Sequence, residues 1–252
     1  MKVFREYAPT LVLLVILVGL WEFMVIWREV PNWILPTPSA IVQALWNNIG
    51  ILTPHVGQTL LEVGLGLGCA IIIGLGLAAL LDVSPWLRRA VYPILVTSQT
   101  IPILALAPLL VVWFGFGIMP KILIVVLFCF FPVAINTSDG LNAADPEYID
   151  LLRAMGANRY QIWRKVRLPA SLPYFFSGLR IAATYSVVAA IVGEWVGAQQ
   201  GLGIYMLRSA NAFRTESLFA AIVISSVLSL LIFFGVFIAE RVAIPWHSKG
   251  KS

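Results

Sequence analysis

The cationic side chains of this chain are gathered in one short stretch, residues 150–173. Its sequence is DLLRAMGANRYQIWRKVRLPASLP, and it holds five of the seventeen lysines and arginines of the chain against the single acid Asp150. Cations clustered in this way bind anionic lipid headgroups or form a docking surface for a soluble partner. Gly156 within the stretch, and Pro169 and Pro173 near its end, indicate that the backbone there is shaped by turns.

Catalytic chemistry has little support in the sequence. A phosphate-binding P-loop requires the pattern G-x-x-x-x-G-K-[ST], whereas the G-K-S at 250–252 has Pro245 at the position of the first glycine. By the topology given below, His55 lies in a solvated loop on one side of a membrane and His247 on the other, so they do not form one site. We therefore expect that the chain is not an enzyme, and that ATP is hydrolysed by a separate polypeptide.

The composition is that of a membrane protein. Hydrophobic residues make up 60% of the 252 residues and charged residues only 12%, whereas soluble domains carry about 25% charged residues. The length allows several crossings of about 20 residues each, so we expect one all-α integral membrane domain over residues 1–252, with its core at about 57–240. Cys69 and Cys129 fall in apolar runs without ligands at metal-site spacing, so neither a metal site nor a disulfide is indicated.

Six apolar stretches are long enough to cross the membrane as helices. If the N-terminus is cytoplasmic, only Arg28, Lys121, Arg208 and Arg214 lie outside among the seventeen basic residues. Because cytoplasmic loops retain lysine and arginine, this asymmetry places both termini and the basic stretch in the cytoplasm, and it explains the net charge of +5 without nucleic acid. The basic stretch then lies in a loop, about 140–176, between the fourth and fifth helices. The six predicted helices cover residues 8–27, 57–81, 93–114, 119–139, 177–199 and 218–239.

The loop is predicted to begin with a short helix that ends in a sharp turn. Asp145, Pro146 and Glu147 are typical of a helix start, because an N-cap acid, a proline at the first position and an acid in the first turn are all favoured there. Gly156 is typical of the residue that follows a helix end. The apolar stripe of this helix consists of Leu151, Leu152 and Met155.

A second short helix is expected to begin after the N-cap residue Asn158 and to close at Pro169 and Pro173. From the residues alone, two interpretations of this amphipathic pair stay open: an interfacial hairpin held by anionic lipid, or a docking surface for a soluble partner. The apolar side chains of the second helix are Ile162, Trp163 and Val166, and its cations are Arg159, Arg164, Lys165 and Arg167.

The loop resembles the EAA loop of permease subunits in bacterial binding-protein-dependent ABC importers. Nine residues separate Gly156 from Val166-Arg167-Leu168-Pro169, as in the family pattern, and Asp150-Leu151-Leu152 stands where the family has E-A-A. The resemblance implies that the loop inserts into an ATPase subunit and couples ATP hydrolysis to transport, so a bulky residue at Gly156 is expected to uncouple the two. The coupling residues that it implies are Asp150, Leu151, Leu152, Gly156, Ala157, Val166, Leu168 and Pro169.

The resemblance covers nearly the whole chain. The subfamily that imports sulfonates, taurine, nitrate and thiamine-precursor pyrimidines is similar in LPTPSAIVQALW (35–46), IPILALAPLLVVWFGFG (101–117), FFPVAINTSDGL (130–141) and GEWVGAQQGLG (193–203). It implies a homodimer in the bacterial inner membrane, two copies of an ABC ATPase that bind ATP and Mg, and an extracytoplasmic solute-binding protein. A passive channel would not need the hairpin, and an intramembrane enzyme would need paired catalytic groups at bilayer depth, which the sequence lacks.

Carboxylates within the spans are the polar groups that could meet the cargo. Glu22, Glu62 and Glu194 are expected in the outer third of the membrane, where they either line the pathway, with Trp195 beside Glu194, or pair with outer arginines or face the headgroups. A negatively charged entrance repels anions, and residues 201–231 are most similar to permeases of the hydroxymethylpyrimidine group. The expected cargo is therefore a thiamine-precursor pyrimidine; aliphatic sulfonate, taurine or nitrate is the alternative, and riboflavin a further one.

Two features of the spans concern packing. Gly64 and Gly68 form a G-x-x-x-G motif, with Gly66, Gly74 and Gly76 nearby, and small residues let helices approach closely. Asp139, Arg180 and Glu240 are expected near the inner face, where they can form ion pairs.

Overall fold

The structure, a computed structural model, describes residues 2–248 and the side chains of residues 8–246. The G-K-S at 250–252 and the side chain of His247 lie outside this described part. The helices are α1 (Lys2–Trp27), α2 (Pro38–Asn47), α3 (Ile49–Val83), α4 (Pro85–Ser98), α5 (Ile103–Phe114), α6 (Ile118–Asn142), α7 (Pro146–Ala154), α8 (Arg159–Ile162), the π-helical turn η1 (Trp163–Arg167), α9 (Leu168–Glu194), α10 (Leu202–Asn211), α11 (Thr215–Ala243) and α12 (Pro245–Ser248).

Five stretches of the described chain are long and apolar enough to cross a membrane, and a sixth crossing requires α4 and α5 together. The axes of α4 and α5 are bent by 94°, so the continuous helix expected over 93–114 is wrong. Pro102 explains the break, because proline lacks the N–H that continues a helix and disfavours the helical conformation of the preceding residue, Ile101. The second span is also longer than expected, since α3 begins at Ile49. His55 therefore lies within a helix and not in a loop.

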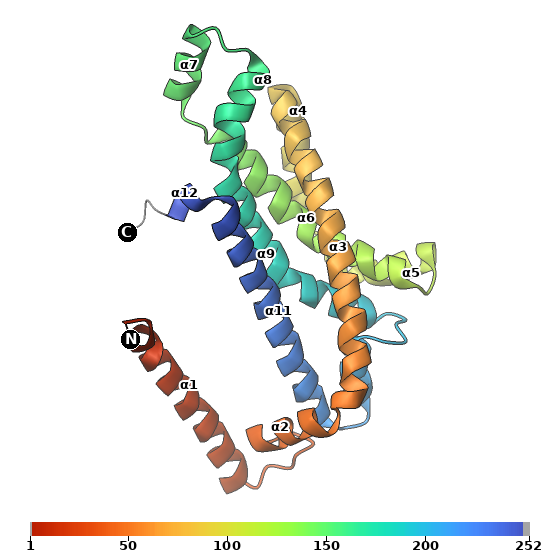
Figure 1. The fold of residues 1–252 in the computed structure, drawn as a ribbon. Helices are drawn as coiled ribbons and strands as arrows, with labels where there is room; N and C mark the ends of the chain where they lie inside the picture. Colours follow the sequence, from red (N-terminus) through yellow and green to blue (C-terminus); the bar gives the residue numbers. More distant parts are fainter. Residues whose placement is uncertain (1, 249–252) are drawn as a thin grey trace.

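The core of the fold is α6, which lies between α3 and α9 (Figure 1). A Cβ added at Gly66 of α3 would lie 2.5 Å from Cβ of Val125, and one at Gly74 would lie 2.8 Å from Cγ1 of Val133. Small residues at these positions let the α3 backbone approach α6. A Cβ at either glycine of the 64–68 motif would meet nothing within 4 Å, so among the glycines expected to let helices approach, Gly66 and Gly74 make the close contact within the chain and the motif does not.

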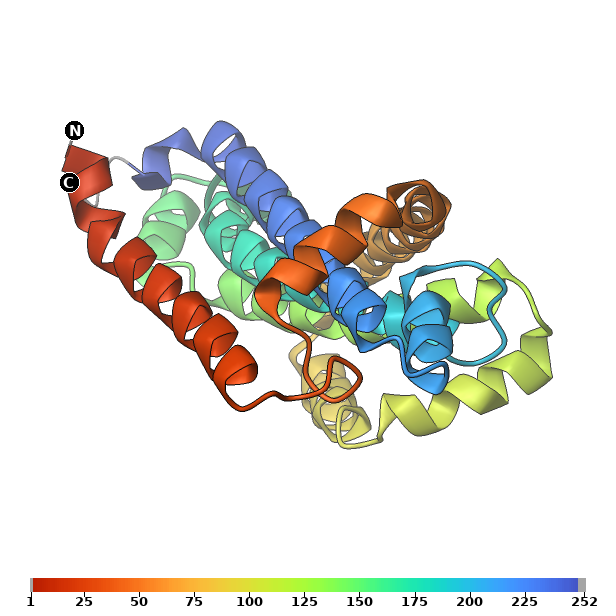
Figure 2. The same cartoon turned by 90° about the horizontal axis from the view of Figure 1, so that it is seen from below.

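Helix α1 lies to one side of the other helices and meets them near its C-terminal end (Figure 2). Val25 is buried there, whereas side chains along the rest of the helix, such as Val15, are exposed. The Glu22 carboxylate accepts hydrogen bonds from the backbone N–H of Ser39 at 3.1 Å and from its hydroxyl at 2.7 Å. Glu22 thus ties α1 to the first turn of α2, and no ion pair with an arginine is formed by it in the described chain.

The end of the molecule formed by α7 and α8 lies opposite the end formed by α2 (Figure 1). Near the α7–α8 end, Arg88 of α4 pairs with Asp139 of α6 at 2.9 Å, and Arg180 of α9 pairs with Glu240 of α11 at 2.5 Å. The expected ion pairing of the inner acids is confirmed, with Asp139 finding its partner on α4.

Candidate functional site

The first half of the basic loop is helix α7, whose ends are held by local hydrogen bonds. Oδ1 of Asp145 accepts the backbone N–H two residues further on at 2.9 Å, which caps the start of the helix. At its end, Gly156 N–H donates to the carbonyl of Arg153 and Ala157 N–H to that of Leu152, both at 2.9 Å, the paired bonds of a Schellman turn. Gly156 has φ +81°, which glycine adopts without strain. The predicted helix and turn are present.

The second half of the loop runs without interruption into a membrane span. Asn158 and Gln161 form a capping box at the start of α8, and the helix continues through η1 into α9. The prediction that Pro169 and Pro173 close it is therefore wrong. Pro169 stands in the first turn of α9, directly after η1, where an N–H group bonds five residues back. This wider turn shifts the carbonyls that a proline ring would otherwise strike.

Three large side chains at α7 are open to solvent and form what we call the apolar face. The exposed fraction is 63% for Tyr148, 58% for Leu151 and 74% for Met155. Caps and turn together hold these side chains on a short rigid element. An exposed apolar patch of this kind marks an interaction site in a folded protein.

The remaining residues singled out by the family resemblance lie beside the apolar face or beneath it. Asp150 is exposed and forms an ion pair with Arg153 at 2.9 Å. The others pack partly against the rest of the protein, so they anchor the hairpin to the spans. These half-buried residues are Leu152, Ala157, Val166, Leu168 and Pro169.

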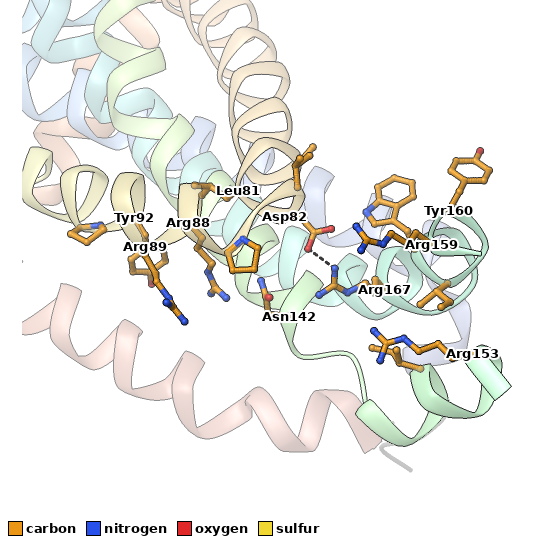
Figure 3. A pocket seen from close by; sticks show the side chains of 17 residues that line it. Leu81, Asp82, Arg88, Arg89, Tyr92, Asn142, Arg153, Arg159, Tyr160 and Arg167 are labelled. Atoms are coloured by element: carbon orange, nitrogen blue, oxygen red, sulfur yellow. Dashed lines mark hydrogen bonds and ion pairs between the residues drawn. The ribbon is translucent and has the colours of Figure 1, made fainter. Parts of the chain in front are cut away.

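One cation of the basic stretch ties the hairpin to α3. Nη1 of Arg167 lies 2.8 Å from Oδ1 of Asp82 at the end of α3 (Figure 3). The Asp82 side chain is only 8% exposed, so Arg167 pairs with a mostly buried acid of the spans, unlike the exposed cations Arg159, Arg164 and Lys165. Asp82 was missed because it precedes Arg167 by 85 positions. The available signal was its position, because an acid at the end of an apolar span needs a partner.

A second candidate site lies at the other end of α3, where α10 begins. Three successive backbone N–H groups, those of residues 201–203, donate to side chains of α3 and α9. Such groups have no partner within their own helix, so the two spans cap α10 from outside, and we call this arrangement the α10 cap. The acceptors are Nδ1 of His55 and Oγ1 of Thr59, both at 2.9 Å, and Oε2 of Glu194.

The residues of the α10 cap also contact one another. Thr59 Oγ1 donates to Oε1 of Glu194 at 2.6 Å. His55 and Thr59 were missed from the sequence. Their spacing of four residues on one helix, which puts them on the same face, was the available signal.

The two glutamates predicted for the transport pathway come together around the α10 cap. The exposed fraction is 1% for Glu62 and 0% for Glu194, so in this conformation neither carboxyl is open to solvent. Gln58 donates to Oε1 of Glu62 at 2.8 Å. Buried Lys121 donates to the backbone carbonyl of Gly117, the N-cap residue of its helix, and no ion pair between these glutamates and an arginine occurs in residues 8–246. Trp195 is 43% exposed.

Comparison with known proteins identifies the family. Residues 70–243 match the model of the binding-protein-dependent transport system inner membrane component. The chain belongs to this family of permeases. The formylaminopyrimidine transport permease protein ThiX of Halalkalibacterium halodurans is 38% identical, with 98% of each chain covered. The taurine transport system permease protein TauC of Escherichia coli is 28% identical, over 97% of the permease and 92% of TauC.

A solved structure supports the same conclusion for the fold. The permease is similar to a chain of the MetNI methionine ABC transporter in its inward-facing form, with a TM-score of 0.68 and 26% identity over 78% of the permease and 97% of that chain. The expected all-helical membrane fold is confirmed. The permease is an inner-membrane transport subunit and not an enzyme, and it works with a binding protein and a separate ATPase.

The two candidate sites of the permease occupy opposite ends of α3. Asp82, which holds the hairpin, is at one end, and the α10 cap contacts His55 and Thr59 at the other. A membrane-spanning helix thus connects a surface suited to a partner with a buried polar network near the opposite face.

Proposed function

We propose that the hairpin of α7, α8 and η1 is the surface that receives the ATPase subunit. The observation that carries this proposal is the apolar face, held on a rigid hairpin at one end of the molecule. A groove on the ATPase that buries Tyr148, Leu151 and Met155 gains the free energy of apolar burial, about 1.5–3 kcal/mol for each large side chain that is fully covered. The ATP and Mg that drive the cycle bind to the ATPase.

Two connections transmit movement of the hairpin to the membrane. η1 joins it to α9 without a break, and the Arg167–Asp82 ion pair joins it to the end of α3. A displacement of the hairpin by the closing ATPases therefore moves two spans at once. Alternating access to the two sides of the membrane follows from this movement.

Substitution of Met155 tests the docking proposal. Met155→Glu places a charge in the centre of the apolar face, and we expect it to abolish co-purification of the ATPase and ATP-driven uptake. Met155→Leu keeps the apolar surface and should preserve both. Unchanged co-purification of the ATPase with Met155→Glu, at normal abundance, would show that the apolar face is not the docking surface.

We propose an assembly of two permeases and two ATPases, with both termini of the permease in the cytoplasm. The distribution of lysine and arginine supports this orientation, and the exposed apolar side chains of α1 supply surface for a second copy as well as for lipid. Native mass spectrometry of the purified complex checks the stoichiometry. Reporter fusions at each terminus check the orientation, and a reporter active in the periplasm at either end would contradict it.

We propose that the cargo is a pyrimidine of the thiamine-precursor type. The greater identity to ThiX than to TauC supports this choice over taurine and related anions. Because the binding protein selects the cargo, calorimetric titration of the cognate binding protein with formylaminopyrimidine, hydroxymethylpyrimidine, taurine and nitrate is the test. Heat of binding for the pyrimidines alone is expected. Tight binding of taurine with no response to a pyrimidine would overturn the assignment.

We place the outer end of the pathway beside Trp195, whose exposed ring offers a flat surface to a heterocycle. Glu194 then acts on the pathway by holding α10, since its carboxyl is buried and accepts the Gly203 N–H, and buried Glu62 lies beside this contact. Trp195→Ala should raise the KM for uptake and leave the ATPase content of the complex unchanged, whereas Trp195→Phe should transport nearly normally.

A further inference from the structure

A cavity of about 1620 Å³ lies between the hairpin and the α3–α4 turn. Its walls come from the end of α3, the first turns of α4, the inner face of α7, and α8 with η1 (Figure 3). It exceeds the roughly 300–1,000 Å³ typical of small-molecule pockets. A cavity of this size at the end of the spans is open to a molecule larger than a simple ion.

The charges lining the cavity are cationic with one exception, Asp82. Three of the lining arginines have carboxylate partners: Arg88 pairs with Asp139, Arg153 with Asp150, and Arg167 with Asp82 itself. Arg89 on α4 and Arg159 on α8 also line the cavity, and in residues 8–246 neither guanidinium forms a hydrogen bond or ion pair. Two cations on opposite walls are therefore left for an anionic occupant.

The aromatic and apolar residues around the cavity place it at the level of the lipid headgroups. Val83 and Trp86, at the α3–α4 turn, are 79% and 75% exposed. Trp163 and Tyr92 line the cavity itself. Tryptophan and tyrosine gather where hydrocarbon meets water, so an exposed tryptophan directly beside an arginine-lined cavity indicates the boundary between acyl chains and headgroups.

The cavity and the apolar face lie on different sides of α7. Ile149 and Arg153 line the cavity, and at 100° per residue they point about 150° away from the centre of the face that carries Tyr148, Leu151 and Met155. An ATPase seated on the apolar face therefore does not fill the cavity. The bilayer, in contrast, is continuous with it at the α3–α4 turn.

We propose that this cavity binds the phosphate-containing headgroup of an anionic glycerophospholipid from the cytoplasmic leaflet, with Arg89 and Arg159 as the phosphate-binding cations. Basic pockets between membrane helices on the cytoplasmic side recognise such headgroups. The lipid lies between α4 and the hairpin and connects the two. This inference rests on the proposed orientation of the permease in the membrane. It does not depend on the ATPase docking proposal, because it concerns the inner face of the hairpin and the permease alone.

The test is titration of the purified full-length permease, without ATPase, with phosphatidylglycerol, followed by native mass spectrometry. The double variant Arg89→Gln/Arg159→Gln is compared with Arg164→Gln/Lys165→Gln, which removes two exposed cations that do not line the cavity. A basic residue beside an anionic headgroup contributes about fivefold in affinity. We expect the cavity variant to bind phosphatidylglycerol roughly 25-fold more weakly and the control variant to bind it like the wild type.

A third variant, a zwitterionic lipid and competition by inorganic phosphate complete the test. Arg89→Lys/Arg159→Lys keeps the charge and should keep most of the affinity, and phosphatidylcholine should bind no more tightly to the wild type than to the cavity variant. Equal phosphatidylglycerol binding by the wild type and the cavity variant would overturn the proposal. Displacement of the lipid by a modest concentration of inorganic phosphate would identify a site for free anions and would also overturn the lipid proposal. Loss of ATPase co-purification with unchanged lipid binding would assign the cavity to the ATPase instead.

Discussion

Replacing Gly156 by valine is expected to weaken coupling between ATP hydrolysis and transport through backbone strain alone. A Cβ at this position meets no atom within 4 Å, so bulk is not what the turn excludes. The φ of +81° is the constraint, and a left-handed conformation costs an ordinary residue about 1–2 kcal/mol, more when it is β-branched. A cost of this size reduces the equilibrium constant between the native turn and its alternatives by a factor of roughly 5–30.

Asparagine at the same position is the matched control. It is close to valine in size but tolerates positive φ, so Gly156→Asn should stay near the wild type. The assay is the number of cargo molecules imported per ATP hydrolysed by the complete importer in proteoliposomes, where Gly156→Val should lower the ratio at normal abundance. Equal ratios for the two variants would refute the strain argument, and normal transport by Gly156→Val would refute the role of the turn.

Further substitutions test the other contacts. Arg167→Gln and Asp82→Asn should each lower the free energy of unfolding by about 1–3 kcal/mol, because a group is left unpaired, and each should lower the uptake rate. The double variant should lose less stability than the sum of the two single variants. Thr59→Val leaves two partners in the α10 cap without their hydrogen bond and should cost about 1–3 kcal/mol for each buried group, measured as a lower Tm, whereas Thr59→Ser should not. Gly66→Leu should reduce the abundance of folded permease because it separates α3 from α6, and Gly64→Leu, whose side chain has free space, should not.

The cap and the turn of the hairpin could be predicted from the sequence because the residues that form them are close together along the chain. Asp145 caps the helix that follows it directly, and Gly156 closes a turn through bonds that reach back only a few residues. The continuation through Pro169 could not be predicted this way. It depends on η1, where the backbone hydrogen bonds change from four to five residues back, and no single residue type predicts this change.

The remaining contacts could not be predicted from the sequence, because most of them join residues that are far apart along the chain. The ion pair that holds Arg167 and two of the three bonds that cap α10 join residues more than 80 positions apart, and no periodicity in the sequence connects them. The break between α4 and α5 was hidden because apolar residues lie on both sides of it, so hydropathy alone indicates one span. The close contact at Gly66 depends on which face of α3 meets α6, whereas the motif at 64–68 specifies only a spacing.

Cysteine cross-linking between the permease and its ATPase shows whether the ATPase docks on the hairpin. After replacement of Cys69 and Cys129, a single cysteine is introduced at Met155, on the apolar face, or at Trp46, an exposed side chain of α2 at the opposite end. Docking of the ATPase on the hairpin predicts a cross-link from position 155 in the complete importer, with a yield that changes on ATP binding, and none from position 46. A cross-link from position 46 would contradict docking of the ATPase on the hairpin. The absence of a cross-link from position 155, in an importer that transports normally, would contradict it as well.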